Sequence, residues 1–139
     1  MQTQFTIESN GQGLYEFTDS VRNFVAKSGA ESGLLTLFVR HTSCSILVQE
    51  NADPSVLHDL VAYFDRLVPD ANNSQMSWLT HTAEGPDDMP AHIKSAILPT
   101  SISIPILNGD IALGMWQGIF LFEHRQAHMV RKVVGHISA

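Results

Sequence analysis

Two histidines and three carboxylates lie close together in one polar stretch of the chain. His81 and His92 bound twelve residues that also contain Glu84, Asp87 and Asp88. Imidazole nitrogens and carboxylate oxygens together are the ordinary ligands of Zn²⁺ and similar divalent ions. The spacing lacks the His-Glu-x-x-His order of a zinc-binding helix. The stretch therefore predicts a divalent-metal site of unfamiliar motif, with a solvated acidic loop as the alternative interpretation.

His41 is a third candidate ligand, because it lies where an apolar run gives way to polar residues. The segment Arg40-His41-Thr42-Ser43 separates two apolar runs, so the imidazole can be held rigidly and still face a cleft. It can act as a metal ligand or a general base, and the alternative is a hydrogen-bonded histidine at a strand end. We predict that His41, His81 and His92 converge on one divalent ion or one anionic ligand. The nearby Cys44 is flanked by serines on an apolar run and is expected to be buried and inert.

A predicted strand-to-helix junction supplies further polar side chains. Residues 49–54, Gln-Glu-Asn-Ala-Asp-Pro, end an apolar run and begin a helical pattern. Asp53 is expected to cap the helix and Pro54 to occupy its first position. Glu50 and Asn51 have no such structural task, and a helix N-terminus favours anions such as phosphate. They are therefore candidates for catalysis and substrate binding, against the alternative of a polar turn.

An aromatic segment between glycines follows later in the chain. Residues 114–118, Gly-Met-Trp-Gln-Gly, open an apolar strand, and glycine there permits a bulge or a close approach of backbones. Trp116 and Gln117 can line a pocket. Packing of Trp116 in the core is the alternative interpretation.

Short strands and two main helices are expected to position these residues. The apolar patterns predict strands at 2–7, 33–39, 44–49, 101–107, 111–113, 116–123 and 130–137, and helices at about 16–28, 54–67 and 90–98. The run Gly33–Val39 is almost continuously apolar, which predicts burial of both its faces. Asn108-Gly109 predicts a two-residue hairpin. The fold class is therefore α+β, with a mainly antiparallel sheet that forms a sandwich or half-barrel, two main helices and one short helix.

Composition narrows the classes of partner. The 139 residues fit a single domain over 1–139, and their net charge of −6 lacks the basic footprint of a nucleic-acid binder. Charged residues are only 16% of the chain, which favours an oligomer that buries part of the surface. There is no apolar run of bilayer length, and a lone cysteine suits a reducing compartment. A cytoplasmic protein without a membrane partner is expected.

These motifs together resemble the YjbQ-like family, of the secondary thiamine-phosphate synthase type. The matching pieces follow the family's order over about two thirds of the chain. They are His41-Thr-Ser-Cys-Ser45, Glu50-Asn-Ala-Asp53, His81 with Glu84-Gly85, Ala91-His92-Ile93-Lys94, and Gly109 through Leu113-Gly-Met-Trp-Gln-Gly-Ile119. The chain departs from the family at Met115, where Thr is usual, at Pro86–Pro90, where the family is Asn-rich, and after Glu123, where Gly-Pro-Arg is usual. The last two changes adjoin the predicted site and affect the expected substrate more than metal binding.

The resemblance implies a homotrimer with a metal site near its subunit boundaries. It also implies an enzyme that joins a pyrimidine diphosphate to a thiazole phosphate and releases pyrophosphate. The ion is Zn²⁺, which suits three histidines, or Mg²⁺, which suits diphosphate chemistry. Two alternatives stay open: a metal-dependent hydrolase of a small phosphorylated compound, and a non-catalytic protein that binds a metal or ligand. The assigned roles are catalysis for Arg40, Glu50 and Glu84, substrate binding for Asn51, Lys94, Trp116 and Gln117, and metal binding for His41, His81 and His92.

Overall fold

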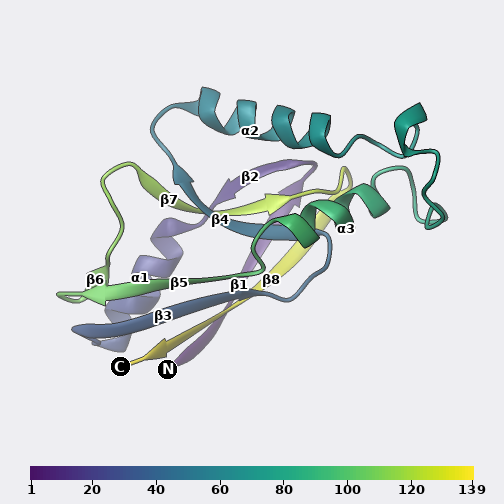
Figure 1. The fold of residues 1–139 in the computed structure, drawn as a ribbon. Helices are drawn as coiled ribbons and strands as arrows, with labels where there is room; N and C mark the ends of the chain where they lie inside the picture. The colour runs from purple at the N-terminus through teal and green to yellow at the C-terminus, as the bar shows by residue number, and fades with distance from the viewer.

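The computed structural model describes residues 1–139 and contains two antiparallel sheets and three α-helices (Figure 1). In chain order the elements are β1 (Gln2–Asn10), β2 (Gly13–Glu16), α1 (Thr18–Ser28), β3 (Ser32–Val39), β4 (Cys44–Glu50), α2 (Pro54–Leu67), the 3₁₀ turn η1 (Ser74–Met76), α3 (Asp88–Ile97), β5 (Ser101–Leu107), β6 (Asp110–Ile111), β7 (Gln117–Glu123) and β8 (His128–Ser138). The predicted α+β class, with a mainly antiparallel sheet and three helices, is confirmed.

The two sheets pack against each other and enclose the core. One has the strand order β1-β8-β3-β5-β6 and the other the order β2-β7-β4. Alternate apolar side chains of both sheets form the core, and the apolar side of α1 packs against them. On the far side of the smaller sheet lies α2, where Phe64 packs edge-on against Phe122 of β7 at a centroid distance of 5.8 Å. None of the helices is both long and apolar enough to cross a membrane.

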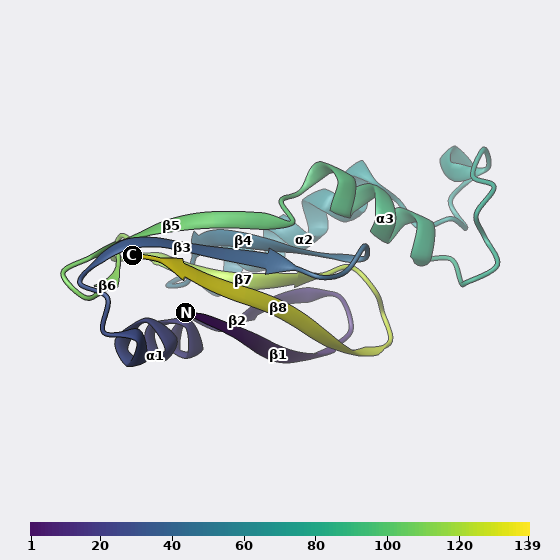
Figure 2. The ribbon, with the colours of Figure 1, turned by 90° about the horizontal axis from the view of Figure 1, so that it is seen from below.

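The prediction that β3 is buried on both faces is wrong. Leu35 and Leu37 point into the core and are fully buried, whereas Leu34 and Phe38 are 42% and 49% exposed. The reason is that no helix covers the outer face of the five-stranded sheet (Figure 2). We call this surface the outer sheet face. It carries the apolar Leu34, Phe38, Val130 and Val134 together with the polar Thr36, Lys132 and His136.

The predicted helix from about residue 16 begins later, at Thr18, because the residues before it form a strand. Gly13–Glu16 pairs with Glu123–Phe120 of β7 as the short strand β2. Four residues are too few to show a clear alternation in the sequence, so the pairing with β7 decides their conformation. The predicted hairpin at Asn108-Gly109 is present, and both residues have the positive φ of a type I′ turn.

The start of α2 is as predicted, with Asp53 as its cap and Pro54 in the first turn. Asp53 Oδ1 accepts hydrogen bonds from the Ser55 backbone N–H at 2.9 Å and from Ser55 Oγ at 2.8 Å. We expect Asp53→Ala to lower the melting temperature by about 3 °C, because the first turn loses its cap. Thermal unfolding followed by circular dichroism measures this. Asp59→Ala is the control, since the exposed Asp59 side chain is hydrogen-bonded only to the exposed His58; equal shifts in the two variants would refute the capping role.

Candidate functional site

The first turn of α3 and the loop before it bring three potential metal ligands together. Nε2 of His81 lies 2.7 Å from Oδ2 of Asp88 and 2.9 Å from Oε2 of Glu84. One ligand atom from each residue lies within 4.8 Å of the other two. We call these three residues the His81 cluster. The side chain of Asp88 is only 4% exposed, whereas His81 and Glu84 face the solvent.

Arg125, from the segment after β7, donates hydrogen bonds to the loop and the helix start that carry the cluster. Its Nη1 donates to Asp88 Oδ1 at 2.6 Å, its Nε to Asp87 Oδ2 at 3.1 Å, and its Nη2 to the Glu84 carbonyl oxygen at 3.1 Å. The guanidinium therefore binds three separate acceptors of the loop and of the helix start. The sequence alone offers no reason to assign Arg125 a role at the site, because its partners lie some forty residues earlier in the chain.

A buried ion pair fixes the segment that carries Arg125. The Glu123 carboxylate is fully buried and accepts hydrogen bonds from Arg131 Nε and Nη2 and from Ser9 Oγ. Its Oε2 also accepts from the backbone N–H groups of His124 and Arg125, both at 3.1 Å. Because Glu123 lies on β7 and Arg131 on β8, the pair also ties the two sheets together.

The charges of the cluster follow from these contacts. The hydrogen bond with Asp88 raises the pKa of His81 above its ordinary value. Burial by itself raises the pKa of Asp88, but the hydrogen bond with His81 and the charge of Arg125 outweigh it and hold that pKa below its usual range. Asp88 is therefore an ionised carboxylate near neutral pH, as a metal ligand must be.

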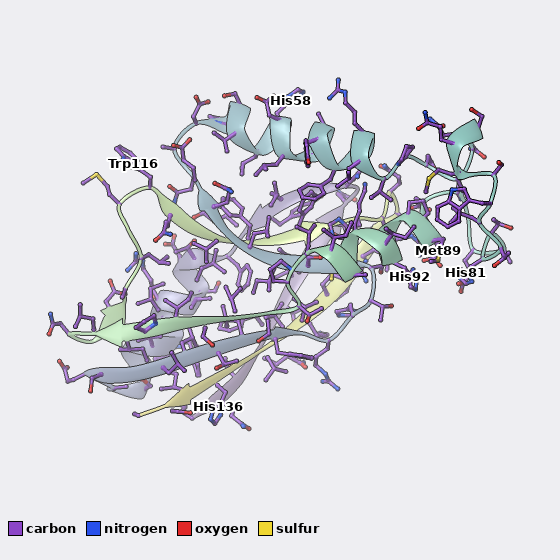
Figure 3. All side chains as sticks on the ribbon, viewed as in Figure 1. His58, His81, Met89, His92, Trp116 and His136 are labelled. Carbon is purple, nitrogen blue, oxygen red and sulfur yellow. The ribbon has the colours of Figure 1, made fainter.

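His92 lies one helical turn after Asp88 and beside His81. The two imidazole rings have their centroids 5.6 Å apart (Figure 3). Nδ1 of His92 donates to the Asp88 backbone carbonyl at 2.7 Å, which leaves Nε2 as the free acceptor of the ring. Metal-binding histidines commonly have one ring nitrogen tied in this way, so the other is fixed in the ligand form. His81 and His92 thus lie side by side.

His41 lies elsewhere in the chain's fold. Its Nε2 accepts a hydrogen bond from the Lys132 backbone N–H at 2.8 Å, which places it beside β8. Burial and then the charge of Arg131 lower its pKa. His41 borders a surface hollow of about 450 Å³ together with Phe38 and Thr100. A single chain therefore does not bring His41 together with His81 and His92.

The remaining predicted residues fall into two further places. At one end of the β4–β7 ladder, Glu50 pairs with Gln117, and the Asn51 N–H donates to the Trp116 carbonyl at 3.0 Å. Trp116 is 59% exposed, so core packing is excluded for it. This group lies at the opposite end of the molecule from His81 (Figure 3).

The two predicted cations also lie apart from the cluster. Lys94 is buried and its Nζ donates to Asp65 Oδ1 at 2.7 Å. Arg40 donates through Nη1 to Gln4 Oε1 at 3.1 Å, on the first strand. Cys44 is buried as predicted, and burial raises the pKa of its thiol to about 12, so it stays protonated.

Comparisons with known proteins agree with this fold along nearly the whole chain. A family model described as "UPF0047 protein YjbQ-like" matches residues 3–139. UPF0047 protein sll1880 of Synechocystis is 48% identical over 99% of this chain and 90% of its own length. UPF0047 protein YjbQ of Escherichia coli O157:H7 is 41% identical over 99% of this chain and 96% of its own. A crystal structure of a yjbq/upf0047 family protein from Clostridium acetobutylicum, 31% identical, superposes with a TM-score of 0.85 and covers 98% and 99% of the two chains.

Proposed function

The chain belongs to the UPF0047 protein YjbQ-like family, and we propose that it is a metal-dependent enzyme that acts on a small phosphorylated molecule at the His81 cluster. The observation that carries this proposal is the gathering of three ligand atoms, from His81, Glu84 and Asp88, within 4.8 Å. His92 adds an imidazole with a free Nε2 beside them.

The donor chemistry fits a divalent ion. One imidazole and two carboxylates supply three ligands and leave a position for water or substrate, as in catalytic rather than structural zinc sites. An ion with bonds of about 2.0–2.1 Å in tetrahedral geometry holds its ligand atoms about 3.3 Å apart. The present separations of 2.7 and 2.9 Å need only a small outward movement of the exposed His81 and Glu84 side chains.

The proposed reaction is the joining of a pyrimidine diphosphate to a thiazole phosphate, as the family resemblance implies. A bound ion would neutralise the charge that develops on the departing pyrophosphate. Three cations near the candidate residues are already engaged within one chain: Arg125 with the two aspartates, Lys94 with Asp65 and Arg40 with Gln4. The site therefore needs further residues from outside the chain.

A homotrimer would supply them, and we propose one for that reason. The outer sheet face is uncovered and mixes apolar with polar side chains, and the hollow beside His41 is open. A neighbouring copy can in this way bring His41, or Glu50, Asn51, Trp116 and Gln117, to the His81 cluster. Light scattering at micromolar concentration should give about three times the chain mass of 15.3 kDa. A monomer mass would remove this part of the proposal.

Metal content tests the cluster itself. We expect the wild-type protein, purified without an affinity tag and equilibrated with Zn²⁺, to keep about one ion per chain after desalting. Asp88→Asn and His81→Ala should retain at least about tenfold less, because each removes a ligand. His58→Ala is the control, since His58 is 82% exposed on α2. Equal metal content in all four proteins, measured by elemental mass spectrometry, would rule the site out.

Activity assays separate the reaction classes. Pyrophosphate release that requires both thiamine precursors supports the transferase. Hydrolysis of a single phosphorylated compound supports a hydrolase instead, in which the 65% exposed Glu84 acts as the general base rather than as a metal ligand and His92 binds the ion in its place. Metal binding without either reaction leaves a non-catalytic binding protein.

A further inference from the structure

We propose that Arg125 makes Asp88 a one-oxygen ligand, so that the His81 cluster selects a small four-coordinate ion of the zinc type over magnesium and calcium. This inference rests on the metal centre proposed above and assigns a positioning role to a residue outside it.

The two oxygens of Asp88 have separate partners. Oδ1 accepts from Arg125 Nη1 at 2.6 Å, and Oδ2 lies 2.7 Å from His81 Nε2. The side chain is 4% exposed, so neither oxygen can exchange its partner for bulk water. An ion that binds between His81 and Asp88 therefore contacts only Oδ2 of Asp88.

The guanidinium cannot readily turn away from Asp88. Its other two nitrogens donate to Asp87 Oδ2 and to the Glu84 carbonyl oxygen. Asp87 Oδ2 also accepts from the Gln126 backbone N–H at 2.8 Å, which fixes that carboxylate in turn. Behind it, the Arg125 backbone N–H is held by Glu123, whose partner Arg131 is 2% exposed. This arrangement is anchored in the core.

Arg125 also fixes the neighbouring ligand. Its bond to the Glu84 carbonyl places the backbone of the residue whose carboxylate contacts His81. A lysine ammonium is a point charge at the end of a flexible side chain. It cannot donate, as the planar guanidinium does, to all three acceptors at once. The role therefore depends on the shape of arginine and not only on its charge.

The choice of ion follows from the donors that remain. Calcium takes six to eight oxygen ligands and commonly a bidentate carboxylate, and magnesium prefers six oxygens in octahedral geometry. With Oδ1 of Asp88 occupied, the cluster offers the imidazole nitrogen of His81, a single oxygen of Asp88 and the carboxylate of Glu84. That mixed set of few ligands is typical of zinc.

The test is the binding of Zn²⁺, Co²⁺, Mg²⁺ and Ca²⁺ to the full chain and to Arg125→Lys. For the wild type we expect Zn²⁺ to bind at least about 100-fold more tightly than Mg²⁺ or Ca²⁺, and Co²⁺ to give the intense visible absorption of four-coordinate cobalt. For Arg125→Lys we expect about 10- to 100-fold weaker Zn²⁺ binding and a loss of that absorption. Arg22→Lys is the matched control, since Arg22 pairs with Asp110 away from the cluster.

The outcomes are distinguishable. If the wild type binds none of the four ions, the proposed metal centre fails and this inference falls with it. If the wild type binds Zn²⁺ and Arg125→Lys has the same affinity and cobalt spectrum, the metal centre stands and the role of Arg125 is refuted. If Arg125→Lys does not fold, the wild type still decides, because Ca²⁺ or Mg²⁺ binding as tight as that of Zn²⁺ contradicts the one-oxygen ligand.

Discussion

Replacing Arg131 with methionine is expected to lower the free energy of unfolding by about 3–5 kcal/mol, because it leaves the Glu123 carboxylate buried without its cation. Glu123 is fully buried, and Arg131 supplies two of its hydrogen bonds. Burial by itself raises the pKa of Glu123, but the bonds from Arg131 and Ser9 hold it below its ordinary value. Urea unfolding at pH 7 measures the loss.

Two further variants decide whether the loss of stability comes from the unpaired charge of Glu123. The double variant Glu123→Leu with Arg131→Met removes both ions, and we expect it to be more stable than Arg131→Met alone. Arg22→Met breaks an exposed ion pair with Asp110 and should cost less than about 1 kcal/mol. If the double variant is instead the least stable of the three, the pair contributes in its own right and the explanation is wrong.

A second large effect is expected from pH, through His124. This residue is 2% exposed, and burial, with the charge of Lys94, lowers its pKa from 6.5 to about 3. Nε2 contacts Ser45 Oγ at 2.9 Å, whereas Nδ1 is buried without a partner. The unfolded chain therefore binds a proton at His124 below pH 6.5 that the folded chain excludes, and stability falls as the pH falls. At about 1.4 kcal/mol per pH unit, the loss between pH 6.5 and pH 4 is about 3 kcal/mol.

The control for this prediction is His124→Gln, which keeps a polar group for Ser45 but does not titrate. Its unfolding free energy should change much less between pH 6.5 and pH 5.5, above the range in which ordinary carboxylates protonate. His41 shifts in the same direction as His124, so a smaller slope remains. His58→Gln, on the exposed face of α2, should show the full wild-type slope. Identical slopes in all three proteins would mean that His124 is protonated in the folded state.

Much of the fold could be predicted from local patterns. Asp53-Pro54 marks the start of α2, and Asn108-Gly109 marks the hairpin, because each acts through the backbone of its own neighbours. The strand β2 and the exposed face of β3 could not be predicted, since they depend on which segments pair with them and on what covers the sheet.

The candidate site divides in the same way. His81, Glu84 and His92 are near one another in the sequence, so a loop and one helical turn suffice to gather them. The role of Arg125 could not be predicted, because it lies 37 residues from Asp88 and the two meet only when β7 is in place. His41 was grouped with them only because histidine is a common metal ligand. Residue type does not determine where a side chain lies, and His41 lies beside β8.

The position of β8 has a consequence for synthesis on the ribosome. This strand is made after all the others, yet it lies between β1 and β3 and pairs with both. Until residues 128–138 emerge, β1 has no hydrogen-bonding partner and β3 is paired on one side only. β1 therefore stays unpaired for most of translation, and the larger sheet is completed in a single late event. Nascent chains of this protein are expected to need protection from mutual strand pairing until that event is complete.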